Sequence, residues 1–351
     1  MLGFGMKGLA LAVYWVGAAL VESIARTDMA GRLTMFTNVL VFSTYATYVV
    51  MSFMMLVMIF MLLPQAQVSA ERINEVLNTK PHVVEGSKTE GCETGTVEFR
   101  DVSFRYPHAA ADELEHISFR VERGQTLAII GATGSGKTTL VQLIPRFYDV
   151  TGGAVLVDGV DVRRVTQDSL RRSIGIIQQD VFIFAGTIRE NIRYGRPDAT
   201  DAQVRAAAAL VHADAFIEKQ ECGYDTEVGE GGARLSTGQK QLISFARVML
   251  ADPRIFVLDE ATSSIDTETE QLIQQAITHV LRGRTSFIVA HRLSTIRHAD
   301  RILVIRGGRV VETGTHEALM AARGYYYDLY THQFREEAMQ GALHTRARTA
   351  P

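Results

Sequence analysis

The chain divides into an apolar N-terminal part and a longer part in which short apolar runs alternate with polar ones. No charged residue occurs from Leu33 to Ala70, and the run Leu33–Leu63 would be about 46 Å long as a helix. This exceeds the ~30 Å hydrocarbon core of a bilayer, so we expect a long, tilted transmembrane helix. Pro64 permits a kink or a pause before a polar continuation to Leu77. The alternative is a long buried helix of a soluble protein.

A second, shorter apolar segment runs from Gly8 to Val21, between Lys7 and Glu22. As a helix it covers only about 21 Å, so it is marginal as a membrane span unless Met1 to Met6 are added. We expect a helix over about residues 4–21. The alternative is a signal peptide, with Lys7 as the basic flank and Ser23-Ile-Ala25 as a small-x-small cleavage site.

After these segments the pattern changes to that of a mixed α/β domain. Residues 78–94 are polar and turn-rich, which predicts a linker, and about 240 residues from Gly95 onward can form their own core. The expected organisation is therefore a partial transmembrane domain (1–77, with helices about 4–21 and 33–63 and an extension to 77), a linker (78–94), an α/β domain (95–334) and a C-terminal tail (335–351).

Within this domain, alternating or wholly apolar runs predict the strands. The strands 254–258 and 285–290 are nearly all apolar, as expected for a parallel sheet that is buried on both faces. The remaining predicted elements are a half-buried strand over 96–104, a hairpin over 153–162, helices over about 200–219 and 238–250, and a strand 301–305 that turns at Gly307-Gly308 into 309–311.

The clearest chemical signal is Gly131-Ala-Thr-Gly-Ser-Gly-Lys-Thr138, which directly follows the apolar run 127–130. A strand followed by G-x-x-x-x-G-K-[ST] is a phosphate-binding loop, in which glycines let backbone N–H groups surround an anion at a helix N-terminus. We expect Lys137 to reach the β- and γ-phosphates and Thr138 to ligate Mg²⁺. The predicted nucleotide ligands in this region are Gly131, Thr133, Gly134, Ser135, Gly136, Lys137, Thr138 and Thr139.

Composition and charge narrow the range of partners. Charged residues make up 21% of the chain and the formal net charge is −3. Because the sequence has no basic patch with interleaved aromatic residues, we do not expect a nucleic acid partner. Cys92 and Cys222 stand alone, without a Cys-x-x-Cys pattern or histidines beside them, so they indicate neither a metal site nor a disulfide framework.

Taken in order, the motifs resemble the nucleotide-binding domain of ABC transporters, fused behind a membrane domain as in half-size ABC exporters. The resemblance covers essentially the whole chain. It implies an all-α transmembrane segment followed by an ABC-type P-loop NTPase, with a RecA-like core, an antiparallel β subdomain and an α-helical subdomain. Family members carry six membrane helices, so the two apolar segments look like the fifth and sixth, and the chain looks like the C-terminal part of an exporter.

The resemblance implies roles for residues around the nucleotide. Tyr106 stands where family members stack an aromatic ring on adenine. Gln179 matches the glutamine that contacts Mg²⁺ and the attacking water, although Gln178 stands beside it where many relatives have proline. The assignment within this pair stays open.

Two carboxylates and a histidine complete the implied hydrolytic site. In Arg254-Ile-Phe-Val-Leu-Asp-Glu260, the apolar strand places Asp259 beside the metal, through water, and Glu260 where it can orient or deprotonate the attacking water. His291 follows another buried strand and matches the histidine that contacts the γ-phosphate. The catalytic residues implied are thus Glu260, His291, Gln179 and Lys137.

Leu235-Ser-Thr-Gly-Gln239 resembles the ABC signature, normally Leu-Ser-Gly-Gly-Gln. In the family this segment closes on ATP held by the opposite subunit, which implies a dimer in which Ser236, Gly238 and Gln239 face the partner's ATP. Thr226–Gly232 and Ser263–Asp266 resemble the X-loop and the D-loop of exporters.

Thr237 departs from the family pattern because it places a β-branched side chain where a glycine lets the backbone approach phosphate. This favours a heterodimer, whose partner carries a disabled catalytic site, over a homodimer that simply tolerates the threonine.

The expected function is that of an ATP-hydrolysing exporter subunit, with ATP and Mg²⁺ as cofactors. We expect a multi-pass protein of the inner or plasma membrane, with a cytoplasmic nucleotide-binding domain and a bilayer around its helices. Five methionines on one helix face, Met51, Met54, Met55, Met58 and Met61, either pack against neighbouring helices and lipid or adapt to hydrophobic substrates. The substrate class stays open among small molecules, lipids and peptides.

Two alternatives to this function remain. One is a membrane-tethered ABC ATPase that does not itself transport. The other is a soluble ABC protein of DNA repair or translation, which should lack the Leu33–Leu63 span.

Overall fold

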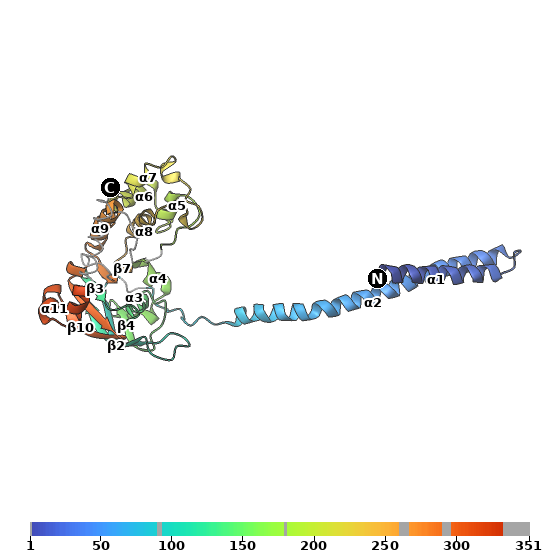
Figure 1. Cartoon of the computed structure of the whole chain (residues 1–351), viewed down its shortest axis with the longest axis horizontal. Helices are drawn as coiled ribbons and strands as arrows, with labels where there is room; N and C mark the ends of the chain where they lie inside the picture. Colours follow the sequence, from blue (N-terminus) through green and yellow to red (C-terminus); the bar gives the residue numbers. More distant parts are fainter. Residues whose placement is uncertain (1, 90–92, 179–180, 260–266, 290–295, 333–351) are drawn as a thin grey trace, which may run out of the picture. The chain divides into compact units, whose positions relative to one another are not determined.

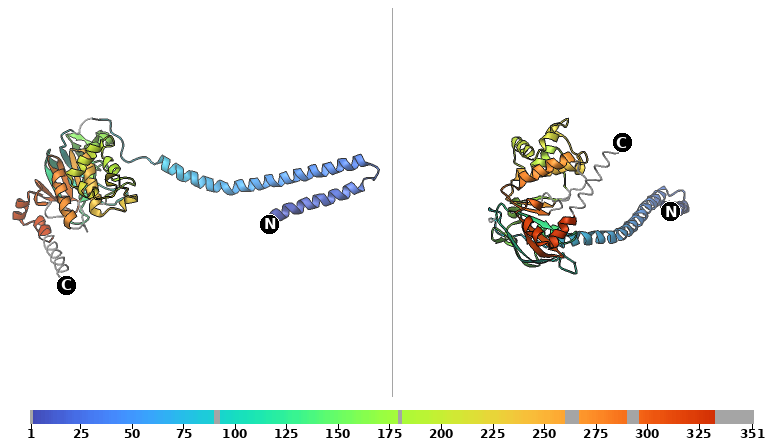
Figure 2. Two further views of the ribbon diagram at one scale, coloured as in Figure 1. Left: turned by 90° about the horizontal axis from the view of Figure 1, so that it is seen from above. Right: turned by 60° about the vertical axis from the view of Figure 1, so that its left-hand side comes forward.

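A computed structural model describes residues 2–89, 93–178, 181–259, 267–289 and 296–332. The chain forms two compact units, Met1–Pro81 and His82–Pro351. Figures 1 and 2 show the helices of the first unit in blue and the sheets and helices of the second in green to red.

The first unit is a pair of helices, α1 (Leu2–Ser23) and α2 (Met29–Asn78), which lie side by side (Figure 2). Asp28 begins α2 by accepting a hydrogen bond from the Gly31 amide at 2.9 Å, which satisfies one of the free N–H groups of the first turn. The helices approach closely at Gly17, where an added Cβ would lie 2.4 Å from Cγ1 of Val39.

Helix α2 does not pause at Pro64, as the sequence would have permitted, but continues to Asn78. A proline costs a helix one backbone hydrogen bond, and the Ala, Gln, Glu, Arg and Leu residues that follow are good helix formers. Within the described part of the chain, α2 is the one helix long and apolar enough to cross a membrane, judged by length and composition. The span by α1 stays a prediction.

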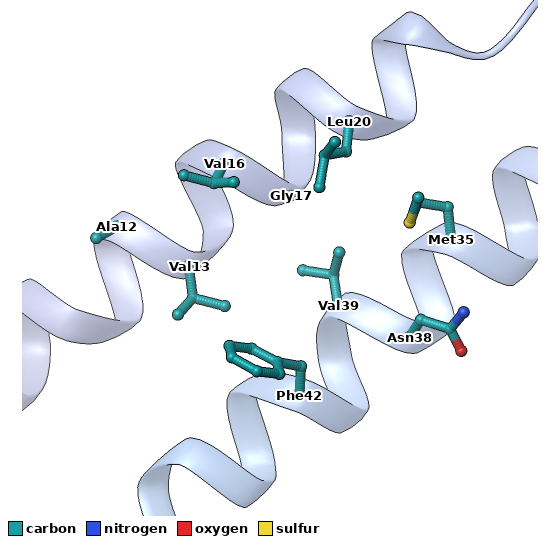
Figure 3. Close-up of a pocket in the computed structure, with 9 residues that line it drawn as sticks. All are labelled: Ala12, Val13, Val16, Gly17, Leu20, Met35, Asn38, Val39 and Phe42. Atoms are coloured by element: carbon teal, nitrogen blue, oxygen red, sulfur yellow. The ribbon is translucent and has the colours of Figure 1, made fainter.

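An apolar groove lies between α1 and α2 (Figure 3). Asn38 brings a polar side chain to a lining that is otherwise apolar, whereas the hydroxyls of Thr44 and Thr47 bond to carbonyls of their own helix at 2.9 Å. The residues that line the groove are Ala12, Val13, Val16, Gly17, Leu20, Met35, Asn38, Val39 and Phe42.

In its described residues, the second unit has two sheets. The antiparallel sheet has the order β2-β1-β4-β5, and the larger sheet has the order β10-β9-β3-β8-β7-β6, in which only β10 runs antiparallel to its neighbour. The strands are β1 (Val97–Phe104), β2 (Leu114–Val121), β3 (Thr126–Ile130), β4 (Gly152–Val157), β5 (Val160–Asp161), β6 (Ile174–Ile177), β7 (Ile255–Asp259), β8 (Thr285–Val289), β9 (Arg301–Arg306) and β10 (Arg309–Gly314).

Helices cover these sheets and form a separate lobe, seen in yellow and green in Figure 1. They confirm the predicted helix of the signature segment, and the stretch from Thr200 to Lys219 forms two helices rather than one. The helices are α3 (Lys137–Leu143), α4 (Gln167–Arg172), α5 (Ile188–Arg193), α6 (Asp201–Leu210), α7 (Asp214–Ile217), α8 (Thr237–Ala251), α9 (Thr267–Leu281) and α11 (His316–Ala322), with short 3₁₀ turns at Val162–Arg164, Gly223–Asp225 and Glu230–Gly232.

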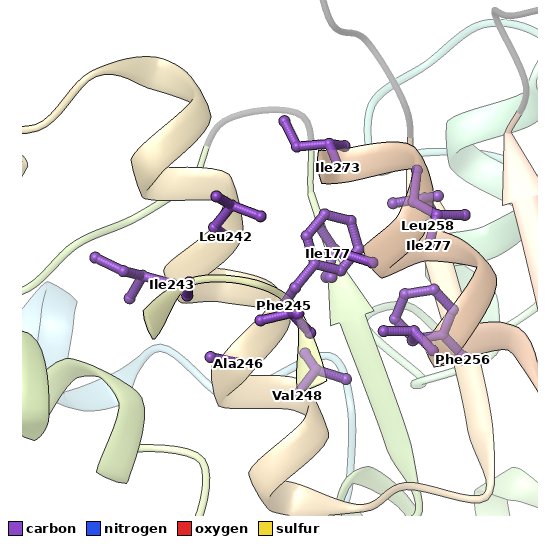
Figure 4. Packing of buried hydrophobic residues seen from close by; sticks show 14 of the residues in the cluster. Ile177, Leu242, Ile243, Phe245, Ala246, Val248, Phe256, Leu258, Ile273 and Ile277 are labelled. Carbon is purple, nitrogen blue, oxygen red and sulfur yellow. The ribbon is translucent and has the colours of Figure 1, made fainter. Parts of the chain in front are cut away.

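The larger sheet is buried on both faces, as the apolar strands predicted. Successive residues of β7 alternate between two cores: Ile255 and Val257 face the antiparallel sheet, whereas Phe256 and Leu258 face the helices. Figure 4 shows Phe245 of α8 and Ile277 of α9 packed beside Phe256 and Leu258. The carboxyl ends of the parallel strands, from which the nucleotide motifs extend, are therefore fixed by packing on two sides.

The first residues of the second unit, which the sequence predicted as part of a linker, are docked on the rest of that unit. Residues 82–89, here called the docked segment, share backbone hydrogen bonds with Arg164 and Thr166: Ser87 and Lys88 donate to the Arg164 carbonyl at 3.1 and 2.9 Å, and Thr166 donates to the Lys88 carbonyl at 2.8 Å. A Cβ at Gly86 would lie 2.3 Å from the Val165 carbonyl oxygen. This close approach holds the docked segment against the domain.

Arg146 contacts the docked segment through a hydrogen bond to the Val84 carbonyl. Its side chain is 3% exposed, donates to both carboxylate oxygens of Asp149 at 2.6 and 3.1 Å, and reaches the Val84 carbonyl at 2.8 Å. It also donates to the carbonyls of Val162 and Arg163. One buried guanidinium therefore ties the turn after α3 to the chain that arrives from the first unit.

Asp158 fixes the start of β1 in the same region. Its carboxylate accepts hydrogen bonds from the amides of Thr94, Gly95 and Thr96 and from the Thr94 hydroxyl. Partial burial by itself raises the pKa of Asp158, but these hydrogen bonds outweigh it, so the pKa lies below its usual range.

We predict that Asp158→Asn lowers the free energy of unfolding by about 1–2 kcal/mol, since an amide replaces a charged acceptor that is partly exposed. A carboxylate with a lowered pKa stabilises the folded state above the unfolded pKa of about 3.9 and loses this effect as pH falls through the folded value. The difference from wild type should therefore shrink below about pH 4. Thermal unfolding of the detergent-solubilised chain measures it.

The matched control is Asp168→Asn, because Asp168 is largely exposed and, among the residues that the structure describes, forms its one ion pair with Arg172 across one helical turn. It should change the free energy of unfolding by no more than about 0.5 kcal/mol. Equal losses from both variants would contradict the role given to Asp158.

Candidate functional site

The phosphate-binding loop follows β3 and leads into α3, as the motif predicted. Gly134 and Gly136 have φ angles of 73° and 96°, in the left-handed region that favours glycine, and Gly136 caps α3. A Cβ at Gly131 would lie 2.3 Å from the Ile305 carbonyl oxygen. The loop thus has the backbone conformation that glycine permits and no room for a larger residue at its first position.

Lys137 is buried and folds back over this loop. Its Nζ donates to the carbonyls of Gly131 and Ala132, both at 2.9 Å. Burial lowers the pKa of Lys137, and the carboxylate of Asp259 acts in the opposite direction. A buried ammonium with so few carbonyl partners is suited to an anion, whose charge would favour the protonated form.

Ser135 provides a second indication that the loop accommodates an anion. Its hydroxyl is buried and has no hydrogen-bond partner among the described residues. Such an unsatisfied group costs free energy unless a ligand or water completes it. Thr133, Gly134 and Thr138 lie exposed on the same loop, so the residues present fit a polyphosphate.

The structure brings Tyr106 to the helix that leaves the loop. Its hydroxyl lies 3.0 Å from Oγ1 of Thr139 and 3.4 Å from Oε1 of Gln142. The ring is half-buried, which leaves part of it open to a ligand. Gln142 was not among the residues predicted from the sequence.

Asp259 ends β7, two strands away from β3 along the sheet. The described residues contain no group of three or more His, Cys, Asp or Glu side chains that could hold a metal ion. Mg²⁺ usually takes one or two protein ligands and completes its shell with water and phosphate, so Thr138 and Asp259 remain a suitable donor pair. Glu260, His291 and Gln179, and the Ser263–Asp266 segment, lie outside the described residues.

The signature segment forms the N-terminus of α8. Ser236 accepts a hydrogen bond from the Gln239 amide at 3.2 Å, and the Gln239 side chain accepts one from the Ser236 amide at 3.0 Å, which makes a reciprocal capping box. Gly238 is buried and Thr237 is exposed. Within the described residues, no hydrogen bond joins this segment to the phosphate-binding loop of the same chain.

The Thr226–Gly232 segment connects the signature helix with the chain that follows Gln179. The Val228 amide donates to the Gly186 carbonyl at 3.0 Å, and the Ile188 amide donates to the Thr226 carbonyl at 3.1 Å. Lys240 of α8 donates to the Gly231 carbonyl at 2.9 Å. A displacement at any of these three places would therefore act on the other two.

Comparison with known proteins agrees with this geometry. Residues 114–263 match the family model of the ABC transporter. The chain is 48% identical over 269 residues to an uncharacterized ABC transporter ATP-binding protein of Bacillus subtilis (strain 168), across 76% of this chain and 44% of the relative. It is 46% identical over 273 residues to the ATP-dependent lipid A-core flippase of Desulfotalea psychrophila, across 77% and 47%.

Among solved structures, a bacterial Atm1-family ABC exporter with ATP bound aligns with a TM-score of 0.75 and 36% identity, across 95% of this chain and 58% of that one. The chain therefore spans less than half the length of the two curated relatives above.

We predict that Gly131→Ala weakens ATP binding roughly 5- to 150-fold, as expected if the loop must move to relieve an overpacking strain of about 1–3 kcal/mol. Besides the Ile305 carbonyl, the new methyl would meet Oγ of Ser135 at 2.5 Å. Equilibrium binding of ATP to the full chain in detergent tests this.

Gly314→Ala is the matched control, because a Cβ there meets Leu319 only at 3.4 Å and the φ angle is not positive. It should bind ATP as the wild type does. Normal ATP binding by Gly131→Ala would show that the close approach at Gly131 is not needed for the loop to hold the phosphates.

Proposed function

This chain belongs to the ABC exporter ATP-binding/permease family and carries its ATPase domain, and we propose that it is the ATP-binding and ATP-hydrolysing subunit of an exporter. In this proposal, ATP-driven dimerisation and hydrolysis are coupled to the efflux of a hydrophobic or amphipathic substrate. The observation that carries the proposal is the phosphate-binding loop, with its buried Lys137 and unsatisfied Ser135 hydroxyl, in one chain with the apolar helix α2.

The proposed chemistry assigns each residue a distinct task. Backbone amides of residues 131–136 surround the phosphates while Lys137 exchanges its carbonyl partners for phosphate oxygens. Thr138, and Asp259 through water, would hold Mg²⁺, which would supply charge neutralisation on the phosphates.

Glu260 would orient or deprotonate the attacking water, His291 would contact the γ-phosphate, and Gln179 would contact the metal and that water. Hydrolysis then reopens the dimer.

The partner is proposed to be a second ABC half-transporter subunit. ABC exporters act as dimers, and the signature segment of this chain makes no described hydrogen bond to its own phosphate-binding loop. The exposed N-terminus of α8 is therefore free to face the nucleotide of another subunit. The exposed Thr237 favours a heterodimer over a homodimer.

We further propose a multi-pass location in the inner or plasma membrane. ATP is cytoplasmic, so the second unit lies inside, α2 runs from outside to inside, and α1 crosses in the opposite direction. One relative is a lipid A-core flippase by name, which supports a lipid-like or other hydrophobic substrate without identifying it. The exposed methionines of α2 suit such a substrate or the surrounding lipid.

We predict that Glu260→Gln lowers ATP hydrolysis by about 10²- to 10⁴-fold, the usual contribution of a general base, while ATP binding changes little. ATP hydrolysis and ATP binding are both measured on the complex of this chain with its partner subunit, reconstituted in lipid vesicles. Export of a hydrophobic dye by the same vesicles should stop. If dye export continued at the wild-type rate, the chain would instead be a membrane-tethered ATPase that does not itself transport.

We also predict that Thr237→Gly strengthens ATP retention at the partner's site about 3- to 10-fold, because removal of the β-branched side chain lets the backbone of the signature segment approach phosphate. Thr237→Ser keeps a hydroxyl but loses the β-branch, so its ATP retention should lie between that of the wild type and that of Thr237→Gly. The readout is the amount of ATP trapped per dimer after rapid filtration. Unchanged trapping would mean that the threonine does not limit this site.

A further inference from the structure

Three aromatic rings meet beside the phosphate-binding helix. The ring centroid of Tyr106 lies 4.8 Å from that of Phe104 and 5.2 Å from that of Tyr148, and both contacts are T-shaped, with interplanar angles of 81° and 85°. Phe104 and Tyr148 also touch each other, at 5.5 Å. Edge-to-face contacts of this kind are favourable and fix the direction of a ring.

The hydroxyl of Tyr106 adds a third constraint from another direction. It lies 3.0 Å from Thr139 and 3.4 Å from Gln142, both on α3, which begins at Lys137. The ring orientation of Tyr106 is therefore set by α3 at one end and by Phe104 and Tyr148 along its sides.

Tyr148 is itself held by a rigid turn. Arg146 and Asp149 on either side of it form a two-point ion pair, and the Phe147 amide donates to the Gln142 carbonyl at 3.2 Å. The guanidinium of Arg171 lies over the Phe147 ring, 5.4 Å from its centroid. These contacts hold the backbone on both sides of Tyr148, so its ring extends from a constrained position and can act as a support.

We propose that Tyr148 is a positioning residue for nucleotide binding, which holds the Tyr106 ring in the orientation that stacks on the base. This inference rests on the proposed function, because it needs a nucleotide whose base lies on Tyr106. A ring that is already oriented loses little side-chain freedom when the base arrives, and a loose ring loses more. Tyr148 thus acts through Tyr106 and on the base, with no part in phosphate binding.

The test compares two ligands that differ by the nucleoside. ATP and inorganic tripolyphosphate, each with Mg²⁺, are bound at equilibrium to the full chain in detergent. Tyr148→Ala should weaken ATP binding about 2- to 10-fold, the range expected for loss of one aromatic contact, and leave tripolyphosphate binding unchanged. In hydrolysis assays, Tyr148→Ala should raise the KM for ATP and leave kcat unchanged.

Two variants act as controls. Tyr148→Phe keeps the ring and should restore wild-type ATP affinity. Phe147→Ala removes the neighbouring ring, which contacts Arg171, but keeps the Arg146–Asp149 ion pair and the bond from its own amide to the Gln142 carbonyl, so it should leave ATP affinity within about twofold.

Two outcomes would overturn the inference: equal weakening of both ligands by Tyr148→Ala, which would indicate general damage to the fold, or unchanged affinity for both. Failure of the wild type to bind ATP would instead overturn the proposed function, so the two failures are distinguishable.

Discussion

The structure depends on one steric constraint, the lack of space around the phosphate-binding loop. A Cβ at Gly131 would strike the end of β9, and one at Gly136 would lie 2.7 Å from Leu114 at the start of β2. The first glycine of the loop therefore lies against the larger sheet and the last against the antiparallel sheet, while Thr133 and Gly134 between them stay exposed. The Gly308 amide donates to the Ser135 carbonyl, and the Glu115 amide donates to the Gly308 carbonyl, which connects the sheets at this point. Glycine is required at Gly131 and Gly136 because the sheets approach the loop so closely there, and the positive φ at Gly134 and Gly136 gives the loop a backbone suited to surround an anion.

A continuous set of contacts extends from this loop through the second unit. Helix α3 begins at Lys137, bonds Tyr106 through Thr139, and ends near the turn that carries Arg146. Arg146 in turn reaches the docked segment, into which the chain passes from the first unit. Each contact is a hydrogen bond or a packed ring, so a change at the nucleotide has a physical route to the segment that leads from α2. Such continuity permits coupling, and its strength is a matter for measurement.

The sequence predicted those elements whose pattern is local. The phosphate-binding loop, the apolar strands β7 and β8 and the hairpin β4–β5 were confirmed because each needs only its own residues and their period. Strand β2 was not predicted from the sequence. It pairs with β1 through two register shifts, and His116 has a φ of 53°. The alternation of apolar and polar residues by which a strand is recognised in a sequence is therefore interrupted within β2. The docked segment was predicted only as a linker, because its bonds use backbone atoms that every sequence has. Tyr148 and Tyr106 are distant in the sequence, and only the fold brings them together.

The signature segment shows why a motif alone does not specify a contact. Two of its polar side chains, those of Ser236 and Gln239, already accept hydrogen bonds from each other's backbone amides in the capping box of α8. Binding a partner's phosphate would therefore exchange these hydrogen bonds for others, with little net gain from the side chains themselves. The attraction that remains comes from the helix N-terminus and its backbone amides, which act only at short range. In the proposed dimer, Thr237, which is exposed at the first turn of α8, would therefore act by keeping a phosphate sterically away from these amides.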